Sequence, residues 1–141
     1  MPANGDRTLE LGCGEGRVAR DLTRRGHHVV AVDVSAVLVR HAAESSTGET
    51  YILAAAAALP FAVAGFDLVV AYSSLMDIDG MSDALREVSR VLRPGGRLCI
   101  CVTHPINDAG GFVDVTPMHR SSVAARTSAG KDSRRPTSGR A

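Results

Sequence analysis

Short continuous runs of apolar residues alternate along the chain with segments in which apolar residues recur at helical spacing. The continuous runs predict strands, because a strand covered on both faces of a parallel sheet shows no polar alternation. By this criterion we expect strands at His28–Val34, Phe66–Tyr72 and Arg97–Thr103, and we add a short strand at Arg7–Leu11 and a weaker candidate at Thr50–Leu53.

Three segments between these runs predict helices. The first covers residues 16–25 and ends where Gly26 can take the C′ position. In the second, Ser35 is an N-cap for a helix that runs to Glu44.

The third predicted helix covers Met81–Leu92, and the proline and glycine pair of "RPGG" (93–96) ends it. We expect it to turn one apolar stripe to the core. The members of that stripe are Met81, Leu85, Val88 and Leu92.

The resulting order β-α-β-α-β-β-α-β predicts an α/β fold, a doubly wound and mostly parallel sheet with helices on both faces. Sheets of this kind bind ligands at the carboxyl ends of their strands. The segments expected to meet at that edge are Gly12–Gly16, Asp33, Ala54–Ala56, Tyr72–Asp77 and His104.

The stretch "LELGCGEGR" (9–17) places three glycines between the first strand and the first helix. Such a loop presents free backbone N–H groups at the positive end of a helix. The dinucleotide fingerprint needs a further glycine at the position of Arg17, which argues against a pyrophosphate ligand and an NAD-dependent enzyme. Asp33 ends the second strand, where a carboxylate accepts hydrogen bonds from ribose hydroxyls. Alternatively, Asp33 caps the helix that follows Ser35.

Four segments, "LELGCGEGR", "VVAVDVS", "LPFAVAGFDLVVA" and "REVSRVLRPGGRLCI", carry a family resemblance over residues 7–105. In order and spacing the chain resembles the class I S-adenosylmethionine-dependent methyltransferases, in the small-molecule branch related to quinone biosynthesis. The resemblance implies a Rossmann-like sheet, of whose seven family strands about five are present here. It also implies methyl transfer from S-adenosyl-L-methionine to a small-molecule acceptor, with S-adenosyl-L-homocysteine as the product.

The resemblance further implies a role for each residue of the site. Glu10 positions the methionine amino group, and the backbone of the glycine loop wraps the methionine and ribose. Asp33 binds the ribose hydroxyls, Val34 and the segment after the third strand enclose the adenine, and the segment after the fourth strand approaches the sulfonium. The loop and enclosing residues are Gly12, Cys13, Gly14, Gly16, Ala55, Ala56, Tyr72 and Ser73.

Some residues depart from the family pattern or allow two interpretations. Ala55 stands where relatives place an acidic residue against the adenine, which predicts weakened cofactor binding. His104 is a candidate general base or substrate contact, or else a loop histidine that only packs. Asp77 and Asp79 face the methyl acceptor or begin the next helix. We expect no metal, because the His and Cys residues lack ligand spacing.

The two ends of the chain differ from the family. Few residues precede the first strand, and no strand-like run follows the fifth, so we expect a partial methyltransferase core at 1–115, truncated at both ends. The fifth strand would then be an exposed edge, which predicts self-association. A truncated, non-catalytic cofactor-binding relic is the alternative function.

Charge and composition complete the picture. Residues 116–141 carry six basic residues and one acidic residue, and their Ser, Thr, Pro, Gly and Ala content predicts a disordered tail. Without interleaved aromatics the tail is a poor nucleic-acid partner. The sequence lacks a signal peptide and a membrane-length apolar run, which predicts a cytoplasmic protein. Cys13, Cys99 and Cys101 are expected to be buried structural thiols.

Overall fold

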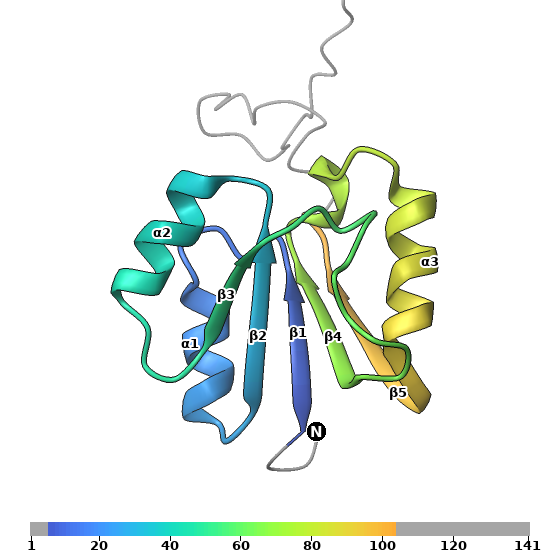
Figure 1. The fold of residues 1–141 in the computed structure, drawn as a ribbon, viewed down its shortest axis with the longest axis horizontal. Helices are drawn as coiled ribbons and strands as arrows, with labels where there is room; N and C mark the ends of the chain where they lie inside the picture. Colours follow the sequence, from blue (N-terminus) through green and yellow to red (C-terminus); the bar gives the residue numbers. More distant parts are fainter. Residues whose placement is uncertain (1–5, 104–141) are drawn as a thin grey trace, which may run out of the picture. The chain divides into compact units, whose positions relative to one another are not determined.

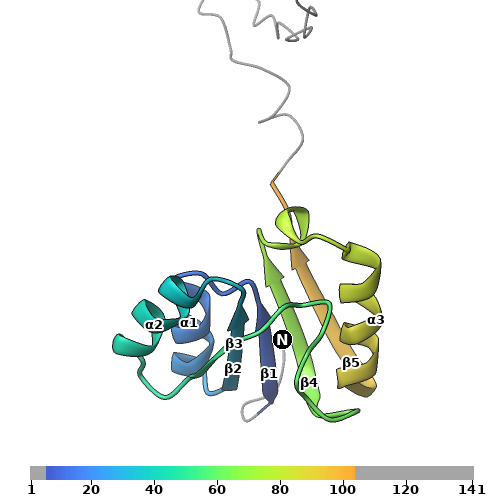
Figure 2. The same cartoon turned by 45° about the horizontal axis from the view of Figure 1, so that its top comes forward.

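A computed structural model describes residues 6–103, and its sheet is built around strand β1 (Arg7–Leu11). All five strands are parallel, in the order β3-β2-β1-β4-β5. The sheet confirms the predicted α/β class, and the carboxyl ends of the strands meet at one edge (Figure 2). The other strands are β2 (His28–Asp33), β3 (Thr50–Leu53), β4 (Phe66–Tyr72) and β5 (Leu92–Cys101).

The helices follow the sequence signals at their ends. Helix α1 (Arg17–Arg24) begins after the glycine loop, and α2 (Ala36–Glu44) begins at Ser35, whose hydroxyl accepts a hydrogen bond from the Leu38 N–H at 3.4 Å. Helix α3 (Met81–Val91) and the short 3₁₀ helix η1 (Leu75–Asp77) come between β4 and β5. Figure 1 shows α1 and α2 beside β2 and β3, and α3 beside β4 and β5.

The sheet separates two apolar clusters, so helices cover both of its faces as predicted. On one face Leu9 and Leu11 of β1 pack with Val88 of α3. On the other, Ala31 of β2 packs with Ala19 of α1. Alternation along each strand divides the residues between the two clusters. Because β1 is the central strand, with β2 on one side and β4 on the other, both leucines are fully buried.

The predicted apolar stripe of α3 is wrong in part. Met81 and Leu85 are exposed, by 47% and 38%, whereas Val88 is buried as expected. The helix instead turns Ala84, Val88 and Val91 to the sheet. These positions also have helical spacing, and the small Ala84 side chain allows the helix backbone to approach the strands.

Strand β5 begins at Leu92, five residues before the predicted start at Arg97. Leu92 pairs with Phe66 and Arg97 pairs with Leu68, so the residues between them form a bulge that the shorter partner segment does not match. The "RPGG" sequence, expected to separate the helix from the strand, makes this bulge inside the strand. Gly95 has a φ of 79°, which a glycine adopts readily.

The prediction of three buried thiols holds only for Cys13. Cys99 and Cys101 are exposed. They lie on β5, the outer strand of the described sheet, and alternate with Leu98. Leu98 packs against the apolar cluster that contains Val88 of α3. They therefore occupy the sheet face opposite α3.

Some predictions fall on residues that the structure does not describe. His104 and the tail at 116–141 lie outside the described residues, as does the predicted core boundary at residue 115. Within residues 6–103, no helix has the length and apolar content needed to cross a membrane.

Candidate cofactor site

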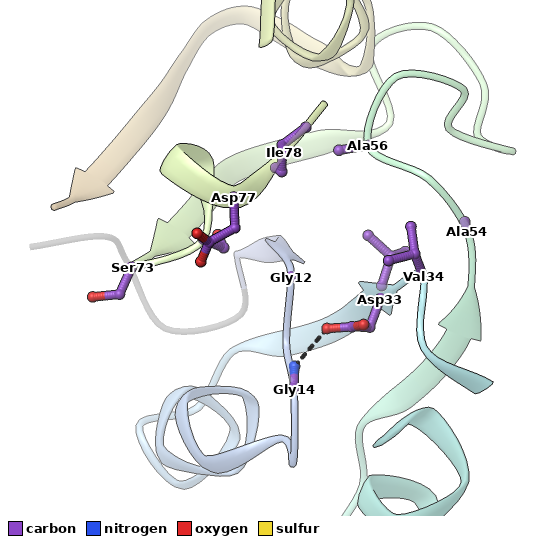
Figure 3. Close-up of a pocket in the computed structure, with 11 residues that line it drawn as sticks. Gly12, Gly14, Asp33, Val34, Ala54, Ala56, Ser73, Asp77 and Ile78 are labelled. Carbon is purple, nitrogen blue, oxygen red and sulfur yellow. Dashed lines mark hydrogen bonds between the residues drawn. The ribbon is translucent and has the colours of Figure 1, made fainter. Parts of the chain in front are cut away.

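A cavity of about 230 Å³ opens at the carboxyl edge of the sheet (Figure 3). Four chain segments, each following a different strand, contribute its walls. The glycine loop and the end of β2 form one side, and the segment after β4 faces them. The lining residues are Gly12, Gly14, Val32, Asp33, Val34, Ala54, Ala56, Ser73, Ser74, Asp77 and Ile78.

Six residues that the sequence assigned to the site line this cavity: Gly12, Gly14, Asp33, Val34, Ala56 and Ser73. Ala55 lies instead in an adjoining hollow of about 280 Å³ that shares Val34 and Ala56 with the first. Glu10, Cys13, Gly16 and Tyr72 are not part of the cavity lining, although all of them belong to the same edge of the sheet.

Asp33 is fixed by two backbone groups. One carboxylate oxygen accepts a hydrogen bond from the Gly14 N–H at 2.8 Å, and the other accepts one from the Ser35 N–H at 2.9 Å. The second bond is a local turn before α2, whose N-cap is Ser35 and not Asp33, and the first ties the glycine loop to β2. Each oxygen keeps a second lone pair, so the carboxylate can still accept hydroxyl donors from the cavity.

Two of the three loop glycines are required by packing. Gly12 has a φ of +66°, and a Cβ there would lie 2.5 Å from the Cβ of Ser74. Gly16 has a φ of +74°, and the Tyr51 ring occupies the space that a side chain would need. The Tyr51 hydroxyl donates a hydrogen bond to the Gly16 carbonyl at 3.4 Å. Around Gly14, by contrast, no heavy atom of the described residues lies within 4 Å of the added Cβ position.

The carboxyl group of Glu10 is buried behind the loop, with only 2% of the residue exposed. Its Oε2 has no hydrogen-bond partner among the described residues. Desolvation raises the pKa of Glu10 to about 8, against the opposing effects of the Ala19 backbone and the Arg17 charge. Burial likewise raises the pKa of Cys13 to about 12, so its thiol is protonated at neutral pH.

At the end of β4 the chain turns sharply away from the sheet. Tyr72 is exposed by 44%, and the Arg17 guanidinium lies over its ring, 5.3 Å from the ring centroid. Ser73 has a φ of 52°, an uncommon value for a residue with a side chain, and its N–H donates to the Cys101 carbonyl at 2.8 Å. Such backbone strain is often found at binding sites.

The segment after β3 has no regular secondary structure. Side chains of α3 hold it through hydrogen bonds to its backbone. The Arg90 guanidinium donates to the carbonyls of Leu59 and Phe61 at 2.9 and 2.6 Å. Glu87 accepts a hydrogen bond from the Leu59 N–H at 2.8 Å and pairs with Arg90 at 2.7 Å. These hydrogen bonds, with that from Arg90 foremost, lower the pKa of Glu87 to about 2. We call this arrangement of Glu87, Arg90 and the Leu59–Phe61 backbone the α3 clamp.

Sequence reasoning placed Ser74 at the ligand-binding edge without a role of its own and left out Ile78, and both line the cavity. The Ser74 hydroxyl donates to the Leu11 carbonyl at 2.6 Å and so joins the turn after β4 to the end of β1. A polar pair directly after a continuous apolar strand is the signal that marks this turn. Asp77 lines the cavity and Asp79 the adjoining hollow. Within residues 6–103, no group of three or more His, Cys, Asp or Glu side chains is arranged to hold a metal.

Comparison with known proteins identifies the family. A family described as "Methyltransferase domain" matches residues 9–100, which include the glycine loop, Asp33 and the α3 clamp. This chain belongs to that family. Membership implies S-adenosylmethionine as the cofactor, and it agrees with the resemblance seen in the sequence.

Two curated relatives support the assignment. The chain is 38% identical over 92 residues to a malonyl-[acyl-carrier protein] O-methyltransferase of Enterobacter lignolyticus (strain SCF1), with 65% of this chain and 37% of that protein covered. It is 38% identical over 103 residues to a demethylmenaquinone methyltransferase of Thermobifida fusca (strain YX), with 70% and 44% covered. The chain therefore spans less than half the length of either relative.

Solved structures agree with the fold. An S-adenosylmethionine-dependent methyltransferase from Mesorhizobium loti has a TM-score of 0.75 and 27% identity, covering 89% of this chain and 60% of that one. The [4+2]-cyclase SpnF has a TM-score of 0.66 and 33% identity, covering 69% and 38%. Since a cyclase has the same fold, the fold alone does not fix the reaction.

Proposed function

We propose that this chain binds S-adenosyl-L-methionine in the cavity between Gly14 and Ser73 and takes part in methyl transfer to a small-molecule acceptor. The observation that supports this most is the placement of the fixed Asp33 carboxylate beside an open glycine backbone at the carboxyl edge. The cofactor supplies an activated methyl group on a sulfonium. The protein's part is then to orient donor and acceptor and to exclude water.

At the nucleoside end, Asp33 accepts hydrogen bonds from the two ribose hydroxyls with its remaining lone pairs. Val34 is exposed by 72% at the cavity wall and provides an apolar surface for the adenine. Ala55 and Ala56 provide the opposite wall. The backbones of Gly12, Cys13, Gly14 and Gly16 follow the methionine and ribose, and of these Gly12 and Gly14 line the cavity.

At the other end, Glu10 pairs with the methionine ammonium group. An ammonium at the free Oε2 would compensate the buried negative charge, so binding at neutral pH would release the Glu10 proton. Tyr72 and Ser73 approach the sulfonium, and Asp77 and His104 are the candidate contacts for the acceptor, with His104 as the candidate base.

The binding test is calorimetric titration of the full chain with S-adenosylhomocysteine, with NAD as the competing ligand. Val34→Lys places a charge on the cavity wall and should weaken binding about tenfold or more. Val37→Lys is the matched control, because Val37 is exposed by 64% on α2 and does not line the cavity. No binding of S-adenosylhomocysteine near millimolar concentration, or binding of NAD instead, would reject the proposal.

We also propose that the chain self-associates through β5, the outer strand of the described sheet. Ile100 and Val102 expose 48% and 57% of their surface there, and an open strand edge pairs readily with another. Sedimentation velocity should detect an oligomer that Ile100→Lys dissociates. Val37→Lys, at an exposed apolar residue of α2, which lies beside β2 and β3, should leave the oligomer intact.

A further inference from the structure

The guanidinium of Arg17 contacts an aromatic ring, whereas the other arginines of α1 contact a carboxylate or a carbonyl group. Arg24 and Arg25 pair with Asp21, and Arg20 donates to the Glu15 carbonyl at 2.8 Å. Arg17 is exposed at the first position of the helix, and the contact described for its guanidinium is with the face of the Tyr72 ring. An aromatic ring under a guanidinium holds it in place and leaves its N–H donors in the plane free to bind an anion.

The Arg17–Tyr72 pair stands at one end of the cavity. Tyr72 directly precedes Ser73, which lines the cavity at the end opposite Val34 and Ala54 (Figure 3). Arg17 follows the glycine loop that forms the floor between these ends. The guanidinium therefore lies away from the nucleoside end, on the side of the cavity where the chain leaves β4.

Glu10 places a carboxyl group on the same side. Its residue partner in β4 is Val70, two positions before Tyr72, so Glu10 and Tyr72 share a face of the sheet. The carboxyl group is buried, its Oε2 has no partner among the described residues, and it lies close enough to Arg17 to feel that charge. A buried polar atom without a partner is costly and calls for a ligand group.

We infer that Arg17, held on Tyr72, binds the α-carboxylate of the cofactor's amino-acid end while Glu10 receives its ammonium group. This inference rests on the proposed function, because it assigns one part of the same cofactor. An amino-acid zwitterion needs a cationic and an anionic partner, and Arg17 and Glu10 provide one of each, near enough for their charges to interact. The planar guanidinium can hold a carboxylate through two parallel hydrogen bonds. Arg17 is thus a positioning residue that fixes the sulfur end of the cofactor against Ser73.

Three ligands separate the groups involved. S-adenosylhomocysteine carries both charges, its decarboxylated analogue keeps only the ammonium, and 5′-methylthioadenosine lacks the amino-acid end. Titrating each into Arg17→Met should show about tenfold weaker binding of S-adenosylhomocysteine and unchanged binding of the other two. Methionine keeps an apolar chain on the Tyr72 ring, so the variant retains the local packing.

Arg20→Met is the matched control. Arg20 lies on the same helix and also acts on the Glu10 charge, but its guanidinium is occupied by the Glu15 carbonyl. It should leave the affinity for all three ligands unchanged. Arg17→Lys keeps the charge without the planar fork and should recover part of the lost affinity.

The inference is overturned if Arg17→Met binds S-adenosylhomocysteine as tightly as the parent chain. It is also overturned if the variant loses the same factor for all three ligands, since the effect would then come from packing around Tyr72. If the parent chain binds none of the ligands, the proposed function itself fails. The parent titrations therefore distinguish failure of the function from failure of the Arg17 assignment.

Discussion

Replacing Glu10 with glutamine should make the ligand-free chain more stable at neutral pH. The carboxyl has a pKa of about 8 in the folded chain and 4.5 as its ordinary value. Between these values the folded chain keeps a proton that the unfolded chain releases. The unfolded state therefore binds fewer protons, and the free energy of unfolding falls as the pH rises through this window.

The size of the effect follows from the shift. Each pH unit between 4.5 and 8 costs the parent chain about 1.4 kcal/mol, so near pH 7.5 the accumulated cost is roughly 4 kcal/mol. Glutamine imitates the protonated carboxyl in shape and does not titrate. Glu49, whose carboxylate accepts hydrogen bonds from the N–H and the hydroxyl of Thr47, and Glu87 both have pKa values lowered to about 2. Their stabilisation is therefore present above about pH 4.5 and is lost as the pH falls toward 2. Their titration lies on the acid side of this window.

Urea denaturation followed by circular dichroism at pH 5, 6, 7 and 8 provides the measurement. At pH 5 the parent and Glu10→Gln should differ by less than about 1 kcal/mol, and at pH 8 the variant should be more stable by several. Glu15→Gln, at an exposed carboxylate of the same loop, should follow the parent at every pH. Parallel pH profiles for the parent and Glu10→Gln would show that Glu10 is ionised in the folded chain and would refute the argument.

Further variants test other parts of the site. Gly12→Ala should destabilise the chain by roughly 2–4 kcal/mol in thermal melts, through its positive φ and its clash with Ser74; Gly14→Ala, which has free space, should cost about half as much. Ala55→Asp should tighten S-adenosylhomocysteine about tenfold by supplying an acceptor for the adenine amino group, and unchanged or weaker calorimetric affinity would contradict this. Glu87→Gln should speed hydrogen exchange of the Leu59 amide about tenfold, whereas an unchanged rate would mean that the clamp does not protect it.

The sequence predicted the elements better than the contacts between them. The bounds of β1, β3 and β4 match, and for β4 the reason is that a continuous apolar run specifies a covered strand directly. The start of β5 was missed because Pro and Gly normally interrupt a strand, and here they form a bulge. The face of α3 was misassigned because two sets of apolar residues share helical spacing, and only the sheet selects between them.

At the site, the carboxyl-edge rule brought most of the cavity residues together from sequence alone. The rule cannot show which glycines have room for a side chain. Ser74 closes the space at Gly12 and Tyr51 closes it at Gly16, and both contacts join residues far apart in the chain. Likewise, local sequence does not reveal that Asp33 binds the glycine loop as well as the nearby Ser35 N–H.

Because of the α3 clamp, the backbone course of the segment after β3 does not depend on which side chains that segment carries. Arg90 and Glu87 grip backbone atoms of Leu59 and Phe61, so the clamp does not depend on the side chains between Ala54 and Ala58. The exposed members of this run, Ala55 and Ala58, can therefore change to suit a different ligand while the loop keeps its course, whereas Ala56 is buried in the core. The clamp holds the backbone of this segment, so ligand preference can be altered through its exposed side chains without redesigning the fold.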